Sequence, residues 1–248
     1  MPYCLDSMTK NVTVFKDPEA LAESFSDQLI GWIADAQADQ FHLALSGGTT
    51  PNLLFSALAS KYADSVLWQK THFWWSDERM VPPDNPESNF GVARRLLFSK
   101  IVLPEKNIHR IRGEMNPQQE AACYAKKIAE EVKMVDGWPV FDLILLGLGE
   151  DGHTASIFPD QMEILESDHI CEVAHHSVSL QPRITLTGRA INHARKICFL
   201  VTGTKKAGRL AEIWSKSEKA KLLPATCVRP VNGKLYWYVD KSAAQLLP

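Results

Sequence analysis

The sequence lacks the features that mark several large classes of protein. Its five cysteines are an odd number with no Cys-x-x-Cys pair, which favours reduced structural thiols over a disulfide framework. Its apolar runs are far shorter than the roughly 20 residues of a membrane-spanning helix. Met1 to Lys10 contains no apolar core of signal-peptide length. These absences predict a cytoplasmic protein that does not bind a membrane.

Charge and sequence motifs exclude further classes. The formal net charge is −2, and Lys and Arg are mixed with Asp and Glu without a basic stripe, so no nucleic-acid partner is expected. There is no G-x-x-x-x-G-K-[ST] loop and no G-x-S-x-G nucleophile motif. His169, His175, His176 and His193 do not show metal-ligand spacing, so the sequence predicts no metal site.

What is present is an alternation of apolar strands and amphipathic helices. The chain has 248 residues, 45% of them hydrophobic, which suits an α/β protein with a substantial core. Helices are predicted after Asp17-Pro18, from Pro51, over 88–99, from Asn116 to about 132 and after Lys206. Short apolar runs predict strands at 41–45, 71–75, 140–146, 197–201 and 234–239.

This order predicts a mostly parallel sheet with helices on both faces. We expect a single domain over residues 1–248, because no low-complexity linker and no internal repeat divides the chain. Residues 160–179 fit neither pattern and could form an excursion from the main domain.

Polar motifs follow several of these strands directly. Ligands bind at the carboxyl ends of strands in open parallel sheets, so the motifs are expected to meet in one crevice. In Ser46-Gly47-Gly48-Thr49, two glycines at a strand-to-helix turn allow backbone N–H groups to face a phosphate; an empty tight turn is the alternative.

Gly147-x-Gly149-x-x-Gly152 formally matches a dinucleotide-binding fingerprint. We reject that interpretation because Glu150 and Asp151 would repel a pyrophosphate, and because Pro159 comes too soon for a long helix. The glycines instead shape a loop that presents Asp151 and His153. A histidine beside two acids at a strand end suits catalysis, and a structural or solvated histidine is the alternative.

Three further candidates have equally simple structural explanations. Ser76-Asp77-Glu78-Arg79 is either part of the site or a solvated, self-paired loop. Lys206 either contacts phosphate or lies on the surface, and Arg183 is a weaker candidate of the same kind.

Together these motifs resemble those of the glucosamine-6-phosphate isomerase/6-phosphogluconolactonase family, and specifically its lactonases. The resemblance runs in order from about residue 12 to residue 240. It is carried by LSGGTTP (45–51), WSDER (75–79), Ser88-Asn89, GLGEDGHTAS (147–156), RITL (183–186) and VTGTKKA (201–207).

The resemblance implies a three-layer, Rossmann-like fold. It also implies hydrolysis of 6-phospho-D-glucono-1,5-lactone to 6-phosphogluconate, the second step of the oxidative pentose phosphate pathway, without a cofactor. A lactone needs only a water nucleophile, a base and charge that stabilises the oxyanion. His153 is then the base, oriented by Asp151 or Glu150, and Arg79 contacts the lactone carbonyl oxygen or instead the phosphate.

The remaining roles follow the same motifs. Asp77 and Asn89 would bind sugar hydroxyls or orient water. Phosphate would be bound by Ser46, Gly47, Gly48, Thr49, Arg183 and Lys206. We expect a monomer, because the sequence has no coiled-coil repeat and no long exposed apolar helix.

Two alternatives stand beside the lactonase. In the related deaminases the Asp-Gly-His loop continues into Asn-Glu-Pro, whereas this chain has Phe158 in place of the Glu, and Arg79 stands where deaminases carry an aromatic residue. Both departures favour the lactonase. A non-catalytic phosphosugar-binding protein on the same fold should have lost the base, yet His153 and its neighbouring acids are present.

Overall fold

A computed structural model describes residues 11–215 and 217–247. The segment Met1 to Lys10, for which the sequence predicts no signal peptide, lies outside these residues. The main sheet has six strands in the order β1-β11-β10-β7-β2-β3, and every neighbouring pair is parallel. Its strands are β1 (Val12–Phe15), β2 (Phe41–Leu45), β3 (Thr71–Trp75), β7 (Leu143–Leu146), β10 (Lys196–Val201) and β11 (Lys234–Asp240).

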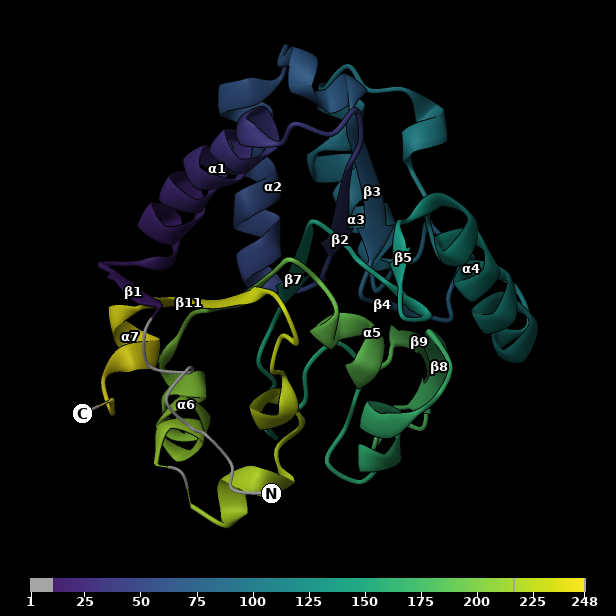
Figure 1. The fold of residues 1–248 in the computed structure, drawn as a ribbon. Helices are drawn as coiled ribbons and strands as arrows, with labels where there is room; N and C mark the ends of the chain where they lie inside the picture. Colours follow the sequence, from purple (N-terminus) through teal and green to yellow (C-terminus); the bar gives the residue numbers. More distant parts are fainter. Residues whose placement is uncertain (1–10, 216, 248) are drawn as a thin grey trace.

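Helices cover both faces of this sheet (Figure 1). On β11, the Tyr238 ring packs against Phe25 of helix α1 (Pro18–Asp35), with centroids 4.8 Å apart. The neighbouring Trp237 packs against Trp214 of helix α6 (Ala207–Trp214) at 5.0 Å. Successive residues of a strand point to opposite faces, so α1 and α6 lie on opposite sides. The predicted three-layer α/β fold is therefore confirmed. The helices are α1 (Pro18–Asp35), α2 (Thr49–Tyr62), α3 (Asn89–Leu96), α4 (Pro117–Glu131), α5 (Gly188–Asn192), α6 (Ala207–Trp214) and α7 (Lys241–Ala244).

The helix starts follow local capping chemistry. The Asp17 side chain accepts a hydrogen bond from the Ala20 N–H and caps α1, as predicted. The predicted start of α2 at Pro51 was wrong, because the helix begins earlier, at Thr49. Proline is compatible with this place because N–H groups of the first turn have no intrahelical partner.

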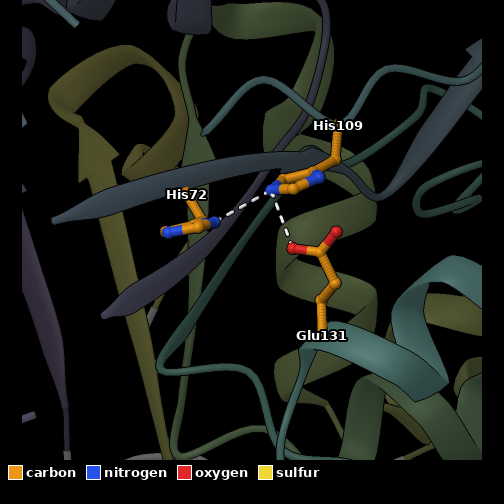
Figure 2. A group of neighbouring side chains, drawn as sticks. All are labelled: His72, His109 and Glu131. Carbon is orange, nitrogen blue, oxygen red and sulfur yellow. Dashed lines mark hydrogen bonds and ion pairs between the residues drawn. The ribbon is translucent and has the colours of Figure 1, made fainter. Parts of the chain in front are cut away.

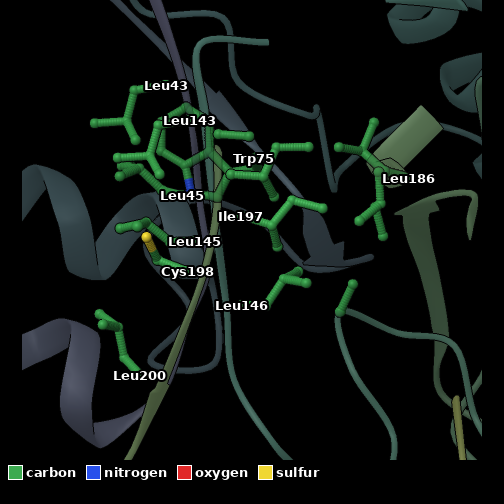
Figure 3. Packing of buried hydrophobic residues seen from close by; sticks show 14 of the residues in the cluster. Leu43, Leu45, Trp75, Leu143, Leu145, Leu146, Leu186, Ile197, Cys198 and Leu200 are labelled. Carbon is green, nitrogen blue, oxygen red and sulfur yellow. The ribbon is translucent and has the colours of Figure 1, made fainter. Parts of the chain in front are cut away.

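The centre of the sheet is apolar on both faces (Figure 3). All residues of β2 and β7 are buried, and Leu43, Leu143 and Cys198 are among the side chains packed there. The strand predicted over 140–146 begins only at Leu143, because the Val140 N–H bonds to the Lys133 carbonyl outside the sheet.

A second, antiparallel sheet in the order β4-β9-β8 accounts for the ambiguous segment. Residues 160–179 form a 3-10 turn (Met162–Glu166) and then β8 (Cys171–His175), which pairs with β9 (Pro182–Leu186). The segment expected as a polar loop after β3 is the short strand β4 (Asp77–Arg79), which pairs with β9 on its other side. A two-stranded ribbon of β5 (Met134–Val135) and β6 (Trp138–Pro139) completes the strands.

None of the helices in the described part of the chain is both long enough and apolar enough to cross a lipid bilayer.

Candidate active site

A pocket of about 500 Å³ lies at the carboxyl ends of β2, β3, β7 and β10. This is the edge at which open parallel sheets bind ligands. Every site residue predicted from the sequence lines it: Ser46, Gly47, Gly48, Thr49, Asp77, Arg79, Asn89, Asp151, His153, Arg183 and Lys206. The predicted convergence of the motifs is therefore present in the fold.

The glycine turn after β2 forms one wall of the pocket. Gly48 has φ of 114° and stands at the N-cap of α2, where no side chain of the described residues caps the helix. Gly47 lies against the Asn89 side chain, so that a Cβ at this position would collide with the Asn89 amide. The turn thus leaves the helix N-terminus open to an anion.

His153 and Asp151 form a close pair on the loop after β7. The His153 Nδ1 atom lies 2.6 Å from the Asp151 carboxylate, which also accepts the His153 backbone N–H at 3.0 Å. Burial alone would raise the pKa of Asp151, but these hydrogen bonds outweigh burial and lower it to about 2. Asp151 is therefore ionised at neutral pH and favours the His153 tautomer that carries its proton on Nδ1.

Of the two acids named for orienting His153, only Asp151 bonds to it in the described chain. The Glu150 carboxylate lies 3.7 Å from Lys205 Nζ, and its carbonyl accepts a hydrogen bond from Arg209. Gly149 makes the close pair possible, because a Cβ there would collide with both the His153 ring and the Asp151 carboxylate.

Two guanidinium groups lie side by side on the small sheet. Arg79 and Arg183 are direct partners in the β4–β9 pairing, and both side chains line the pocket. Among the described residues, the Nε atoms of both are buried without a hydrogen-bond partner. Burial, with the neighbouring Arg79 charge second, lowers the pKa of Arg183. The Arg79 Nη1 group donates to the Glu87 carbonyl at 2.7 Å. Two adjacent cations that line one pocket are suited to bind an anion.

Glu78 orders the backbone next to Arg79. Its buried carboxylate accepts the backbone N–H groups of Arg79, Asn89 and Phe90, each at 2.8 Å. Burial raises the pKa of Glu78 to about 7, although the three N–H groups oppose this shift. Glu78 thus fixes the backbone at both Arg79 and Asn89.

The polar floor of the pocket is also well ordered by hydrogen bonds. Asp77 accepts a bond from the Ser156 hydroxyl at 2.6 Å, and its carbonyl accepts one from the Asn89 amide at 2.9 Å. The hydroxyls of Thr50 and Thr202 lie 2.7 Å apart and join the start of α2 to the end of β10. Lys206 lies beyond β10, where burial lowers its pKa.

Sequence reasoning missed two contributors. The β8–β9 hairpin adds His176, Ser177 and Val178 to the pocket wall, from the segment whose structure the sequence left open. Phe158 was noted only as a departure from the deaminases, yet its ring packs 4.8 Å from His153. The position of Phe158 directly after the Gly-rich loop was the sequence feature that could have indicated a contact with His153.

Two histidines and a glutamate, none of which lines the pocket, form a separate group. Figure 2 shows these three side chains. His72 Nδ1 lies 2.9 Å from His109 Nε2, which lies 3.7 Å from the Glu131 carboxylate. The two rings are within 11° of parallel and their centroids are 5.2 Å apart, so the two nitrogens face each other along one line. Histidine ligands of a tetrahedral zinc instead direct their lone pairs to one point, about 2.1 Å from each nitrogen. This geometry is that of a hydrogen bond, and the absence of a metal stays a prediction.

Comparison with known proteins places the chain in a family. The family model described as glucosamine-6-phosphate isomerases/6-phosphogluconolactonase matches residues 16–237. The chain belongs to this family.

Relatives within the family are similar over most of their length. A 6-phosphogluconolactonase of Haemophilus influenzae is 46% identical over 207 residues, which are 83% of this chain and 87% of that protein. Among solved structures, the devB protein superposes with a TM-score of 0.90 at 41% identity, covering 96% of this chain and 99% of that one. The 6-phosphogluconolactonase from Trypanosoma brucei gives 0.88 at 27% identity, covering 98% and 100%.

Proposed function

We propose that this protein hydrolyses 6-phospho-D-glucono-1,5-lactone to 6-phosphogluconate in the oxidative pentose phosphate pathway. The observation that carries the proposal is the Asp151–His153 pair, with its 2.6 Å contact, in a pocket that is also lined by Arg79 and Arg183. The names of the similar proteins agree with this activity. No cofactor is needed, because an ester is cleaved by water, a base and a stabilised oxyanion.

The first chemical step is attack by water on the lactone carbonyl carbon. Asp151 holds the proton on His153 Nδ1, which leaves the Nε2 lone pair free to accept a proton from water. As the new C–O bond forms, the carbonyl π electrons move to its oxygen. We assign Arg79 to stabilise this oxyanion.

Collapse of the tetrahedral intermediate breaks the bond between the carbonyl carbon and the ring oxygen. The proton held by His153 passes to the departing ring oxygen, which becomes a hydroxyl of the product. His153 returns to its neutral form, and the carboxylic acid that is formed releases its proton to solvent to give the carboxylate product.

We assign the phosphate to the open N-terminus of α2 at Gly48 and Thr49, together with Lys206 and Arg183. All four line the pocket, and the helix N-terminus supplies N–H donors and partial positive charge. Asp77 and Asn89 are assigned to sugar hydroxyls, since both side chains line the pocket between the glycine turn and β4.

The deciding experiment is an assay on freshly prepared 6-phosphoglucono-δ-lactone, corrected for spontaneous hydrolysis. We expect catalysed hydrolysis of this lactone and no ammonia release from glucosamine-6-phosphate, because Phe158 stands where the deaminases carry a glutamate. Ammonia release at a comparable rate would favour a deaminase, and phosphosugar binding without turnover of either compound would favour a non-catalytic binding protein.

A further inference from the structure

The ring of Phe158 is buried beneath the pocket and supports side chains that face it. Phe158 has no exposed surface and does not itself line the cavity. It follows the turn at Thr154–Ile157, whose backbone groups bond to each other, so the position of the ring is fixed by the loop that also carries His153.

Three pocket side chains from three segments contact this one ring. The His153 ring lies 4.8 Å from it at an angle of 51°, and the His176 ring of the β8–β9 hairpin lies at 5.4 Å and 81°. The Arg183 guanidinium of β9 lies over its face, with Cζ 5.7 Å from the centroid. Ring–ring and cation–π contacts of these kinds are attractive and depend on orientation, so they restrain the side chains that make them.

His153 and Arg183 have few other restraints among the described residues. The His153 ring has one side-chain hydrogen bond, from Nδ1 to Asp151, which leaves the tilt of the ring to its packing. Arg183 Nε has no hydrogen-bond partner among the described residues, and the face of Phe158 is a contact that orients the guanidinium. Loss of the ring would therefore release both groups at once.

We propose that Phe158 is a positioning residue for lactone hydrolysis, whose buried ring sets the proton acceptor His153 and the anion-binding Arg183 at a fixed separation. The role rests on the proposed function. Phe158 then does more than fill the core. Its ring affects the chemical step through His153 and substrate binding through Arg183.

The test replaces the ring by flexible or branched aliphatic side chains, in Phe158→Leu and Phe158→Met. Either variant should lose about tenfold or more in kcat and should raise KM for the phosphorylated lactone several-fold. Phe25→Leu is the matched control: Phe25 is equally buried and packs against Trp32 and Tyr238, outside the pocket lining. The control should unfold at a lower temperature and keep wild-type kcat and KM.

A double-mutant cycle separates positioning from a general loss of packing. In an Arg183→Ala background, Phe158→Leu should still lower kcat but should no longer weaken binding of 6-phosphogluconate, measured by calorimetry. Kinetic constants in folded Phe158→Leu and Phe158→Met that match those of Phe25→Leu would overturn the proposal, as would undiminished weakening of product binding in the Arg183→Ala background. Wild-type protein that does not accelerate lactone hydrolysis would instead overturn the proposed function, a result that requires no variant.

Discussion

At the scale of single residues, His153 carries the central step. Replacing it with Asn keeps a polar group of similar size but removes the proton acceptor, so kcat should fall by about 10²–10⁴-fold, the usual contribution of a general base. Steady-state kinetics on the folded variant measure this. Affinity for 6-phosphogluconate should change little, because the assigned phosphate contacts lie on other segments. Near wild-type turnover in His153→Asn would remove His153 as the base and make Asp77 or Glu150 the next candidate.

The two arginines can be assigned by comparing two substrates. Arg79→Ala and Arg183→Ala are each assayed on 6-phosphogluconolactone and on glucono-δ-lactone, which lacks the phosphate. A residue that binds phosphate should matter only for the first substrate, whereas one that stabilises the oxyanion should matter for both. We expect Arg183→Ala to lose activity selectively, by about tenfold or more for one charged hydrogen bond of 1.5–3 kcal/mol. Selective loss in Arg79→Ala instead would exchange the two assignments.

At the scale of elements, the turn between β2 and α2 depends on a close backbone approach. A methyl group at Gly47 would collide with the Asn89 amide, which bonds to the Asp77 carbonyl. Gly47→Ala should therefore disturb both the open helix N-terminus and Asn89, raising the Kd for 6-phosphogluconate about tenfold, the equivalent of one or two hydrogen bonds. Calorimetric titration measures the change.

Gly31→Ala is the control for this turn. Gly31 lies within α1, and apart from its chain neighbours and the backbone of its own helix no described atom lies within 4 Å of the added Cβ. The substitution should therefore leave binding unchanged and stabilise the helix by about 0.5–1 kcal/mol. Unchanged binding in Gly47→Ala would show that the turn does not contact the ligand.

The sequence predicted elements best where their signals are local. Asp17 and Asn116 cap α1 and α4 as expected, because a cap involves residues only a few positions apart. Strand β4 was not predicted, because three polar residues become a strand only by pairing with β9 far along the chain. The same distance concealed that Arg79 and Arg183 are neighbours.

At the scale of the whole molecule, buried histidines should make stability depend on pH. Burial lowers the pKa of His42 to about 4 and that of His109 to about 3, and it also lowers the pKa of His72. Free histidine in the unfolded chain titrates near 6.5. Below that pH the unfolded state binds protons that the folded histidines exclude, so the stability that they contribute above about pH 6.5 is lost as the pH falls towards 4. Glu78, with its pKa raised to about 7, has the opposite sign and offsets part of this loss.

Urea unfolding between pH 7.5 and 4.5 measures this effect. Each buried histidine should reduce the free energy of unfolding by up to about 1.4 kcal/mol per pH unit in that window. In His109→Phe, the new ring can stack on Trp74 as the imidazole does at 4.0 Å, and the dependence of the unfolding free energy on pH should become weaker. His169→Phe, at the exposed surface, should leave that dependence unchanged. Equal pH slopes of the unfolding free energy in both variants would contradict a buried, uncharged His109.

We also propose that the chain unfolds as one domain, since one cluster of buried residues extends from α1 to α7.

The sequence by itself determined the alternation of strands and helices, and hence a parallel α/β sheet with its polar motifs at one edge. This follows because hydrophobic period, caps and strand-end glycines are properties of short segments. It also indicated that these motifs meet in one pocket, since parallel strands bring their carboxyl ends to the same edge, but not that His176, Ser177 and Val178 join them there. Only the tertiary structure decided that Asp151 rather than Glu150 bonds to His153, that Arg79 and Arg183 lie side by side, and that Phe158 supports His153 and Arg183. These relations depend on distances between side chains, which are set by packing among segments remote in the chain.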